Sequence, residues 1–438
     1  MSIVASLSSR ADSSVGFVDV DSFQLLRLNP DVRFGPAEYI AGHVMHLAKD
    51  LRTGKYFRVG EKELFLLQQL NGEHTFEKIR SNYARRFGRS ITTGSVQGAL
   101  SLFAYRGLII GLKTDTPSSE IEVCTPTDAM SPGPFTGKIL HWNPDDWIGS
   151  VVPYFRWLLN GPALIAWGLL ILCAELIAFS HASSLWKEFL GHPASSWPLR
   201  LIAVGLVSCA VMNFHEFGHA LACKRYGGAV QEMGYLFRYL SFCAYTRIDD
   251  ILLFRKRLHR VYVLIIGPFV SLSLIPVALL LWMRTQPNTL LHTTTGDLLI
   301  LYNFGCFVQL VPFLQFDGYF ILAQLLKMPD LRKDSYNYLI RWCLSLFSSR
   351  PPMTVAREHA GYLIPIYVGY GSLSLLVSSA ALCYMLAQNG RSIVQTIGII
   401  PSLTLLCLLI TGAVWRILTV TVPWVKSVIQ NKPSKELL

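Results

Sequence analysis

The sequence predicts a polytopic α-helical membrane protein with about six transmembrane helices and an N-terminal soluble α+β domain of winged-helix type. The 438-residue chain is 52% hydrophobic and only 15% charged, a charge content that soluble domains of this length rarely have. Its apolar residues are concentrated after residue 150, in runs long enough to cross a bilayer core of about 30 Å. The residues before 112 instead combine short β-type and helical patterns.

We expect residues 22–112 to form the soluble domain. Segment 43–59 has β-type residues on both sides of the turn-forming sequence RTG, which indicates a hairpin. Three short helical patterns and a short apolar strand follow, and the second helix, within 75–88, ends in a glycine. Residues 113–141 are rich in Pro, Ser and Thr and are interpreted as a linker.

The membrane domain is expected to cover residues 142–425. Its six predicted spans are 160–181, 199–223, 261–283, 298–325, 362–386 and 393–414. Residues 1–150 are electrically neutral, so the net charge of +11 arises entirely from the later residues. The basic residues lie mainly in alternate connections, at 224–260, at 327–359 and after 414. This pattern predicts that both termini are cytoplasmic. It also explains the net positive charge of the chain better than nucleic-acid binding does.

The segment VMNFHEFGHALACK (211–224) places His215, Glu216 and His219 inside the second predicted span. Ionisable residues are costly in a bilayer and usually functional there. In an H-E-x-x-H helix the two histidines are one turn apart and can reach one metal ion, while the glutamate can act as a general base on water. The alternatives are a water-filled cavity or a proton relay in a transporter.

A catalytic zinc ion needs a third protein ligand. The best candidate is Asp317, the only acidic residue of NFGCFVQLVPFLQFDGYFILAQLL (303–326). Pro312 is expected to break this helix, and Gly318 permits close backbone approach. Spans two and four are predicted to run in the same direction, so Asp317 can lie at the depth of the histidines. We therefore expect one Zn²⁺ ion; a buried Asp with a purely structural role is the alternative.

These motifs resemble the site-2 protease-type intramembrane zinc metalloproteases, within them the bacterial peptide zinc metalloprotease branch. HEFGHA and LVPFLQFDGYFIL carry the likeness, and Gly267-Pro268 resembles the family's third-span glycine-proline. The family often has an asparagine three residues before the proline of its DG motif, where this chain has Gln309. The resemblance implies that Gln309, or Asn303 instead, positions the substrate backbone.

Residues 56–88 of the soluble domain resemble the PqqD-like elements that bind leader peptides of ribosomally made, modified peptides. An exposed strand edge can accept an extended peptide as an added strand. The alternative is a winged-helix module used for dimerisation or packing.

The resemblance implies hydrolysis of a peptide bond, with His215, His219 and Asp317 holding zinc and Glu216 moving the proton. A peptide must be extended to be cut. We therefore expect residues 229–250 to form a re-entrant or membrane-surface hairpin, with Gly234 and Tyr235, that aligns the substrate as a strand. Gly318 is a further candidate for substrate positioning.

Three function classes remain open from the sequence. The first is a protease of the bacterial inner membrane that matures a leader-bearing peptide, working beside a peptide-export system. The second is a regulatory protease that cuts a membrane-anchored signalling protein. The third is a non-catalytic peptide-binding component of an export or immunity system. The complete H-E-x-x-H and Asp set favours an enzyme over the third class.

Overall fold

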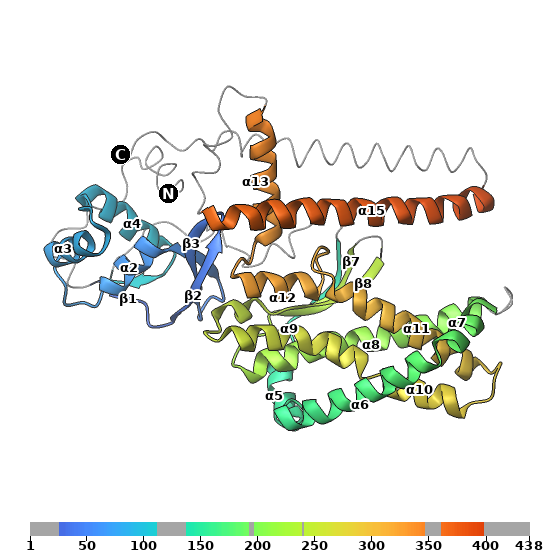
Figure 1. Cartoon of the computed structure of the whole chain (residues 1–438). Coiled ribbons are helices and arrows are strands. Elements are labelled where there is room, and N and C mark those ends of the chain that lie inside the picture. The colour runs from blue at the N-terminus through green and yellow to red at the C-terminus, as the bar shows by residue number, and fades with distance from the viewer. Residues whose placement is uncertain (1–25, 112–136, 192–196, 239–240, 347–360, 398–438) are drawn as a thin grey trace. The chain divides into compact units, whose positions relative to one another are not determined.

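The computed structural model describes residues 26–111, 137–191, 197–238, 241–346 and 361–397 (Figure 1). The chain is mostly helical, with small sheets in its N-terminal region. It divides into two compact units. The first unit contains residues 1–128, 330–372 and 379–438, and the second contains residues 129–329 and 373–378.

The first unit contains a three-stranded antiparallel sheet in the order β2-β3-β4. Its strands are β2 (Val32–Ile40), β3 (His43–Asp50) and β4 (Tyr56–Gly60). The hairpin predicted over 43–59 corresponds to β3 and β4, whereas β2 was not predicted. Ala41 and Gly42 connect β2 to β3 with φ of 50° and 80°, which suits the primed turns of two-residue hairpin loops. A second small pair joins β1 (Arg27–Leu28) to β5 (Ile109–Ile110).

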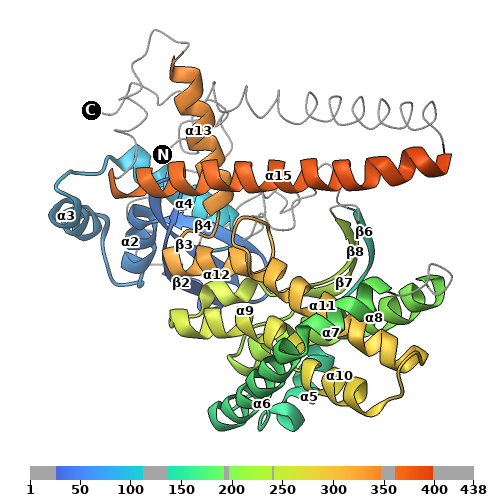
Figure 2. The same cartoon turned by 45° about the vertical axis from the view of Figure 1, so that its right-hand side comes forward.

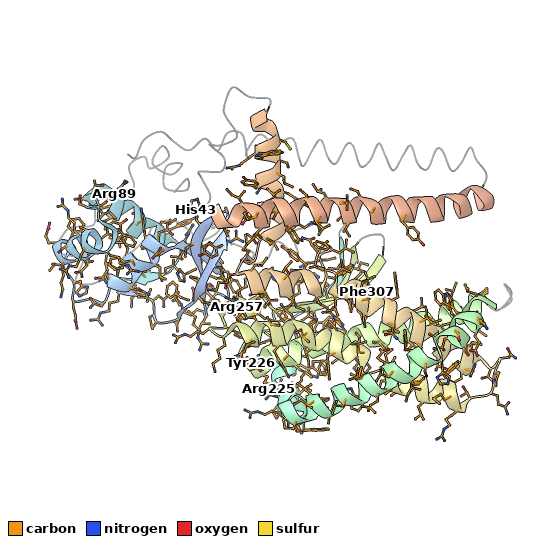
Figure 3. All side chains as sticks on the ribbon, viewed as in Figure 1. His43, Arg89, Arg225, Tyr226, Arg257 and Phe307 are labelled. Carbon is orange, nitrogen blue, oxygen red and sulfur yellow. The ribbon has the colours of Figure 1, made fainter. Side chains whose placement is uncertain are left out.

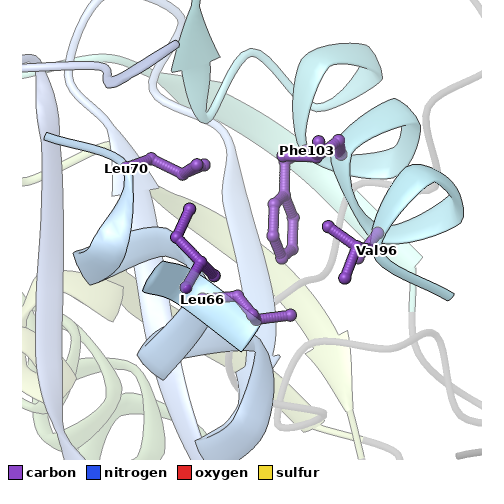
Figure 4. Close-up of a pocket in the computed structure, with 7 residues that line it drawn as sticks. Leu66, Leu70, Val96 and Phe103 are labelled. Atoms are coloured by element: carbon purple, nitrogen blue, oxygen red, sulfur yellow. The ribbon is translucent and has the colours of Figure 1, made fainter. Parts of the chain in front are cut away.

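The three expected helices are α2 (Glu61–Gln69), α3 (Phe76–Phe87) and α4 (Thr93–Tyr105). Helix α3 begins where Thr75 accepts a hydrogen bond from the Lys78 amide, and it ends at Gly88 in the left-handed conformation. Between α2, α3 and α4 lies an apolar cavity of about 10 Å³ (Figure 4). Its lining residues are Leu66, Leu70, Ile79, Val96, Ala99, Leu100 and Phe103. A void this small and apolar stays dry, so it belongs to the hydrophobic core.

Helix α13 (Leu331–Leu346) also belongs to the first unit. It is followed by η6 (Gly361–Leu363) and α15 (Ile364–Ile397). Helix α15 continues through 387–392, the segment that the sequence assigned to the connection between predicted spans five and six. The segment contains no proline, so nothing in it prevents the helical hydrogen bonds from continuing.

Within the described residues, the second unit supplies three helical stretches that are long and apolar enough to cross a membrane, which indicates a membrane protein. They are Gly161–Ser180, Pro198–Arg225 and Arg257–Arg284, and they match the first three predicted spans. The first is α6 (Gly161–Ser180) and the second lies in α8 (Trp197–Arg225). The third combines α9 (Arg257–Leu272) with α10 (Ile275–Arg284). Two shorter helices, α5 (Asp145–Phe155) and α7 (Ala182–Gly191), flank α6.

The predicted fourth span is two helices, α11 (Leu290–Leu310) and α12 (Asp317–Leu326). Residues 311–316 separate them, because Pro312 lacks an amide hydrogen and its ring clashes with the preceding turn. The predicted fifth span, 362–386, falls mainly in α15. The sixth, 393–414, lies outside the described residues from 398 onward.

The second unit also contains a three-stranded antiparallel sheet in the order β6-β7-β8 (Figure 2). Strands β7 (Glu232–Arg238) and β8 (Ser241–Arg247) form the hairpin expected between 229 and 250. Strand β6 (Gly137–Trp142) pairs with β7. Residues 137–141 were assigned to the linker, and their strand partner could not be foreseen because it lies far along the chain. The short helix η5 (Asp249–Leu253) follows β8.

Candidate metal centre

The two histidines of the H-E-x-x-H motif lie on one face of α8. His215 and His219 are both buried, and their Nε2 atoms are 3.1 Å apart. The helical spacing brings the rings together, because residues four apart are neighbours on a helix surface. The sequence alone determines this pair.

Asp317 comes to the histidines from the start of α12. Its Oδ2 atom lies 3.1 Å from Nε2 of His215, and its Oδ1 atom lies 3.4 Å from Nε2 of His219. Gly318 permits the arrangement, because a Cβ atom there would overlap the backbone carbonyl of Leu310 at the end of α11. The break after α11 thus aims the carboxylate at the motif.

The spacing of these atoms suits a tetrahedral zinc ion. Ligand atoms at zinc's usual bond lengths of about 2.0–2.2 Å would lie about 3.4 Å from one another. Here the possible ligand atoms of His215, His219 and Asp317 all lie within 4.8 Å of one another. Two nitrogens and one carboxylate oxygen leave a fourth position for water, as catalytic zinc sites require.

The outer nitrogen of each ring is held by a different residue of α9. Nδ1 of His219 lies 2.6 Å from the carbonyl oxygen of Val263. A carbonyl only accepts hydrogen bonds, so Nδ1 carries the proton and Nε2 keeps a free lone pair. Nδ1 of His215 lies 2.9 Å from the buried hydroxyl of Ser271. These contacts orient both rings for a metal ion.

Gly267 on α9 packs directly against the inner edges of the two rings. A Cβ atom built on it would overlap Nε2 of His219 and lie 2.7 Å from Nε2 of His215. Sequence reasoning singled out Gly267 only through the family resemblance, and it missed the roles of Val263 and Ser271. The contact made by Val263 uses a backbone carbonyl, which leaves no trace in a sequence.

Glu216 lies beside His215, His219 and Asp317 and contacts β8. The Thr246 hydroxyl donates to the backbone oxygen of Glu216 at 3.2 Å and lies within hydrogen-bonding reach of its carboxyl group. A second contact ties the sheet to the same helix, because the Tyr235 hydroxyl donates to Oδ1 of Asn213 at 2.6 Å. The sheet therefore lies against the motif, with the predicted residue Tyr235 at the junction.

Gly234 occupies the middle of β7, where only glycine fits. It pairs with His141 of β6 and with Tyr245 of β8. A Cβ atom there would overlap the backbone carbonyl of Leu140. Gly234 thus allows β6 and β7 to pack closely, and its part in substrate alignment stays a prediction.

The remaining predicted positions lie on α11. Gln309 donates from Nε2 to the Met212 sulfur at 3.7 Å, and among the described residues its buried Oε1 atom has no hydrogen-bond partner. Asn303 donates to the carbonyl of Leu299 at 2.9 Å and hydrogen bonds to Glu175 of α6. Gln309 thus keeps a free acceptor, whereas Asn303 is engaged within the helices.

The basic residues that flank the motif gather at one end of the second unit. Figure 3 shows Arg225, Tyr226 and Arg257 close to this end. Tyr226 stacks on His259 with ring centroids 4.0 Å apart, and Arg257 donates to the carbonyl of Leu325 at 2.9 Å. Arg257 thereby holds the far end of the helix that carries Asp317.

Comparisons of the chain with protein-family models, with curated proteins and with solved structures give no match.

Proposed function

We propose that this protein is an intramembrane zinc metallopeptidase of the site-2 protease type. The observation that carries the proposal is the group formed by the buried His215 and His219 with the half-buried Asp317. Glu216 lies next to the two histidines on α8. Two imidazoles and one carboxylate are a common ligand set for catalytic zinc. When bound, zinc would make a water nucleophilic near neutral pH and polarise a carbonyl group.

The chain's own groups would move the proton. Glu216 accepts a proton from the attacking water and delivers it to the leaving amine of the cut peptide. Thr246 positions Glu216 through its hydrogen bond. Val263 holds His219 in the tautomer that the ligand role needs, and Ser271 orients the ring of His215.

The substrate would be an extended peptide. Strands β6 and β8 are the edges of the β6-β7-β8 sheet, and an edge can pair with an added strand. The hydrogen bond between Tyr235 and Asn213 fixes this sheet two residues from His215. The Oε1 atom of Gln309, which accepts no hydrogen bond from the described part of the chain, can bind a substrate amide.

The proposed topology has six spans with both termini in the cytoplasm of a bacterial inner membrane. Three contacts agree with this topology, because in each of them the two segments that meet are predicted to lie on the same side of the membrane. Strand β6 precedes the first span and pairs with β7, which follows the second. Asp330 follows the fourth span and forms an ion pair with Arg58 of the N-terminal region. On the opposite side, Glu188 follows the first span and lies 3.3 Å from His292, which follows the third.

We propose further that the first unit captures a leader-bearing peptide precursor through its PqqD-like segment. The β2-β3-β4 sheet supports this, because β4 is an edge strand within residues 56–88. The chain would thus mature peptides that an export system then removes.

The test compares cells that make the intact protein, Glu216→Ala and, as a matched control, Glu77→Ala. Glu77 is an exposed residue of α3. Mass spectrometry of membrane-bound and secreted peptides should show an uncut precursor that accumulates only with Glu216→Ala and co-purifies with it. A membrane-anchored signalling protein in its place would identify a regulatory protease. No difference among the three, with zinc bound in all, would indicate a non-catalytic binding protein.

A further inference from the structure

The first turn of α13 is anchored to the sheet of the first unit at two points. Arg58 lies in the middle of β4, and its Nη2 atom is 2.6 Å from Oδ2 of Asp330. The Ala41 amide, at the β2–β3 turn, donates to Oδ2 of Asp334 at 2.7 Å. The Asp330 side chain is 1% exposed, so its charge depends on a partner cation.

The segment that reaches Asp330 begins at the metal ligand. Helix α12 starts at Asp317 and ends at Leu326, and Lys327, with φ of 58°, turns the chain back. The Met328 amide donates to the carbonyl of Ala323 at 2.9 Å. Asp330 is thus separated from α12 only by a tight turn.

This turn is also bonded back to the first turns of α12. The hydroxyl of the buried Tyr319 donates to the carbonyl of Pro329 at 3.4 Å. Tyr319 follows Asp317 by two residues in the helix, and Pro329 directly precedes Asp330. A displacement of Asp330 would therefore act on the helix at both ends, through the turn and through Tyr319.

We propose that Arg58 and Asp330 are positioning residues for Asp317, and that they act through the turn at 327–329 and the hydrogen bond of Tyr319. This inference rests on the proposed metal site. Arg58 lies on an edge strand, so a peptide that pairs with β4 would lie next to the ion pair. Peptide capture and the metal ligand would then be coupled through a short, well-bonded segment of chain.

The test uses the full-length chain with Co²⁺ in place of zinc, because the visible absorption of Co²⁺ reports ligand geometry. The variants are Arg58→Met, Asp330→Asn and the double variant. Arg80→Met is the matched control, since Arg80 is an exposed arginine of α3. Arg58→Lys retains the charge and should rescue most of the effect.

We expect each single variant to bind Co²⁺ about 10-fold more weakly, the usual lower effect of losing a supporting contact, with a changed spectrum. The double variant should lose no more than either single variant, because both remove the same contact. Arg80→Met should match the wild type.

Wild-type affinity and spectrum in both single variants would overturn this inference and leave the metal site standing. An affinity loss in the double variant equal to the two single losses combined would also overturn it. If the wild type binds no more Co²⁺ than His215→Ala, the proposed function fails together with the inference. Asparagine has nearly the same volume as aspartate, so Asp330→Asn removes the charge without disturbing the packing. This variant therefore still decides the test if Arg58→Met does not fold.

Discussion

The carboxylate of Asp317 lies 3.1 Å from His215 and 3.4 Å from His219, although Asp317 begins a different helix. Three separate features produce this approach. Pro312 breaks the helix before Asp317, Gly318 lets α12 start against the end of α11, and Gly267 leaves room beside the rings.

Removal of a ligand should abolish metal binding, whereas removal of the base should not. We expect about one zinc per wild-type chain, and a loss of zinc in Asp317→Ala because two histidines alone bind it weakly. Glu216→Gln should retain zinc and lose peptide cleavage. Elemental analysis of the purified proteins measures the zinc content, and mass spectrometry of the peptides measures cleavage. Full zinc content in Asp317→Ala would refute the assigned ligand.

Gly267→Ala should weaken zinc binding by at least about 100-fold, because the added methyl group would overlap the His219 ring. Gly205→Ala in α8 is the control, since a Cβ atom there meets nothing within 4 Å. Competition with a chelator of known affinity measures the effect. Equal affinities in the two variants would contradict the close packing of Gly267 on the histidines.

Ser271→Ala removes the hydroxyl that holds Nδ1 of His215 and should weaken zinc binding by about 10–100-fold. Ser273→Ala is a matched control, because the Ser273 hydroxyl donates to the Val270 carbonyl one turn earlier and not to a histidine among the described residues. The same chelator competition applies. A larger loss of zinc affinity in Ser273→Ala than in Ser271→Ala would show that Ser271 is not the residue that holds His215.

Gly234→Ala should disrupt the pairing of β6 with β7, since its methyl group would overlap the Leu140 carbonyl. We expect a loss of about 1–3 kcal/mol in unfolding free energy and slower cleavage of the peptide substrate. Gly137→Ala in β6 meets nothing within 4 Å and serves as control. Proline at Gly234 or Tyr235 with unchanged cleavage would exclude a role for the hairpin in substrate alignment.

Asp334 should make the stability of the first unit depend on pH. Burial and the neighbouring Asp330 raise the pKa of Asp334 from 3.8 to about 7, against the opposing effects of the Ala41 amide, Arg58 and Lys333. The folded state therefore keeps a proton that the unfolded chain releases between about pH 4 and 7. Stability should fall as pH rises through this window, by at most about 1.4 kcal/mol per pH unit, and level off above it.

Thermal unfolding in detergent at a series of pH values measures this dependence. Asp334→Asn cannot lose a proton, so its unfolding profile should lack the fall that the wild type shows. Glu77→Gln, at an exposed position, should keep the wild-type profile. Parallel profiles for wild type and Asp334→Asn would show that another group is responsible.

The sequence by itself determined the features that depend on local order. Helical spacing places His215 and His219 on one face, apolar runs give α6, α8 and α9–α10, and a glycine in the left-handed conformation ends α3. Such features depend on residues within one or two turns, and their periodicity is visible in any single chain. The break before Asp317 was also predictable, because proline acts on its own helix.

The tertiary structure alone decided which distant groups complete each arrangement. Val263 contributes a backbone carbonyl and Ser271 a common hydroxyl, and neither residue type indicates a histidine partner. Strand β6 pairs with β7 far along the chain, and Arg58 meets Asp330 in the same way. These contacts depend on how the helices and strands pack. Many residues of the chain offer the same donors and acceptors, so only the packing selects the partners.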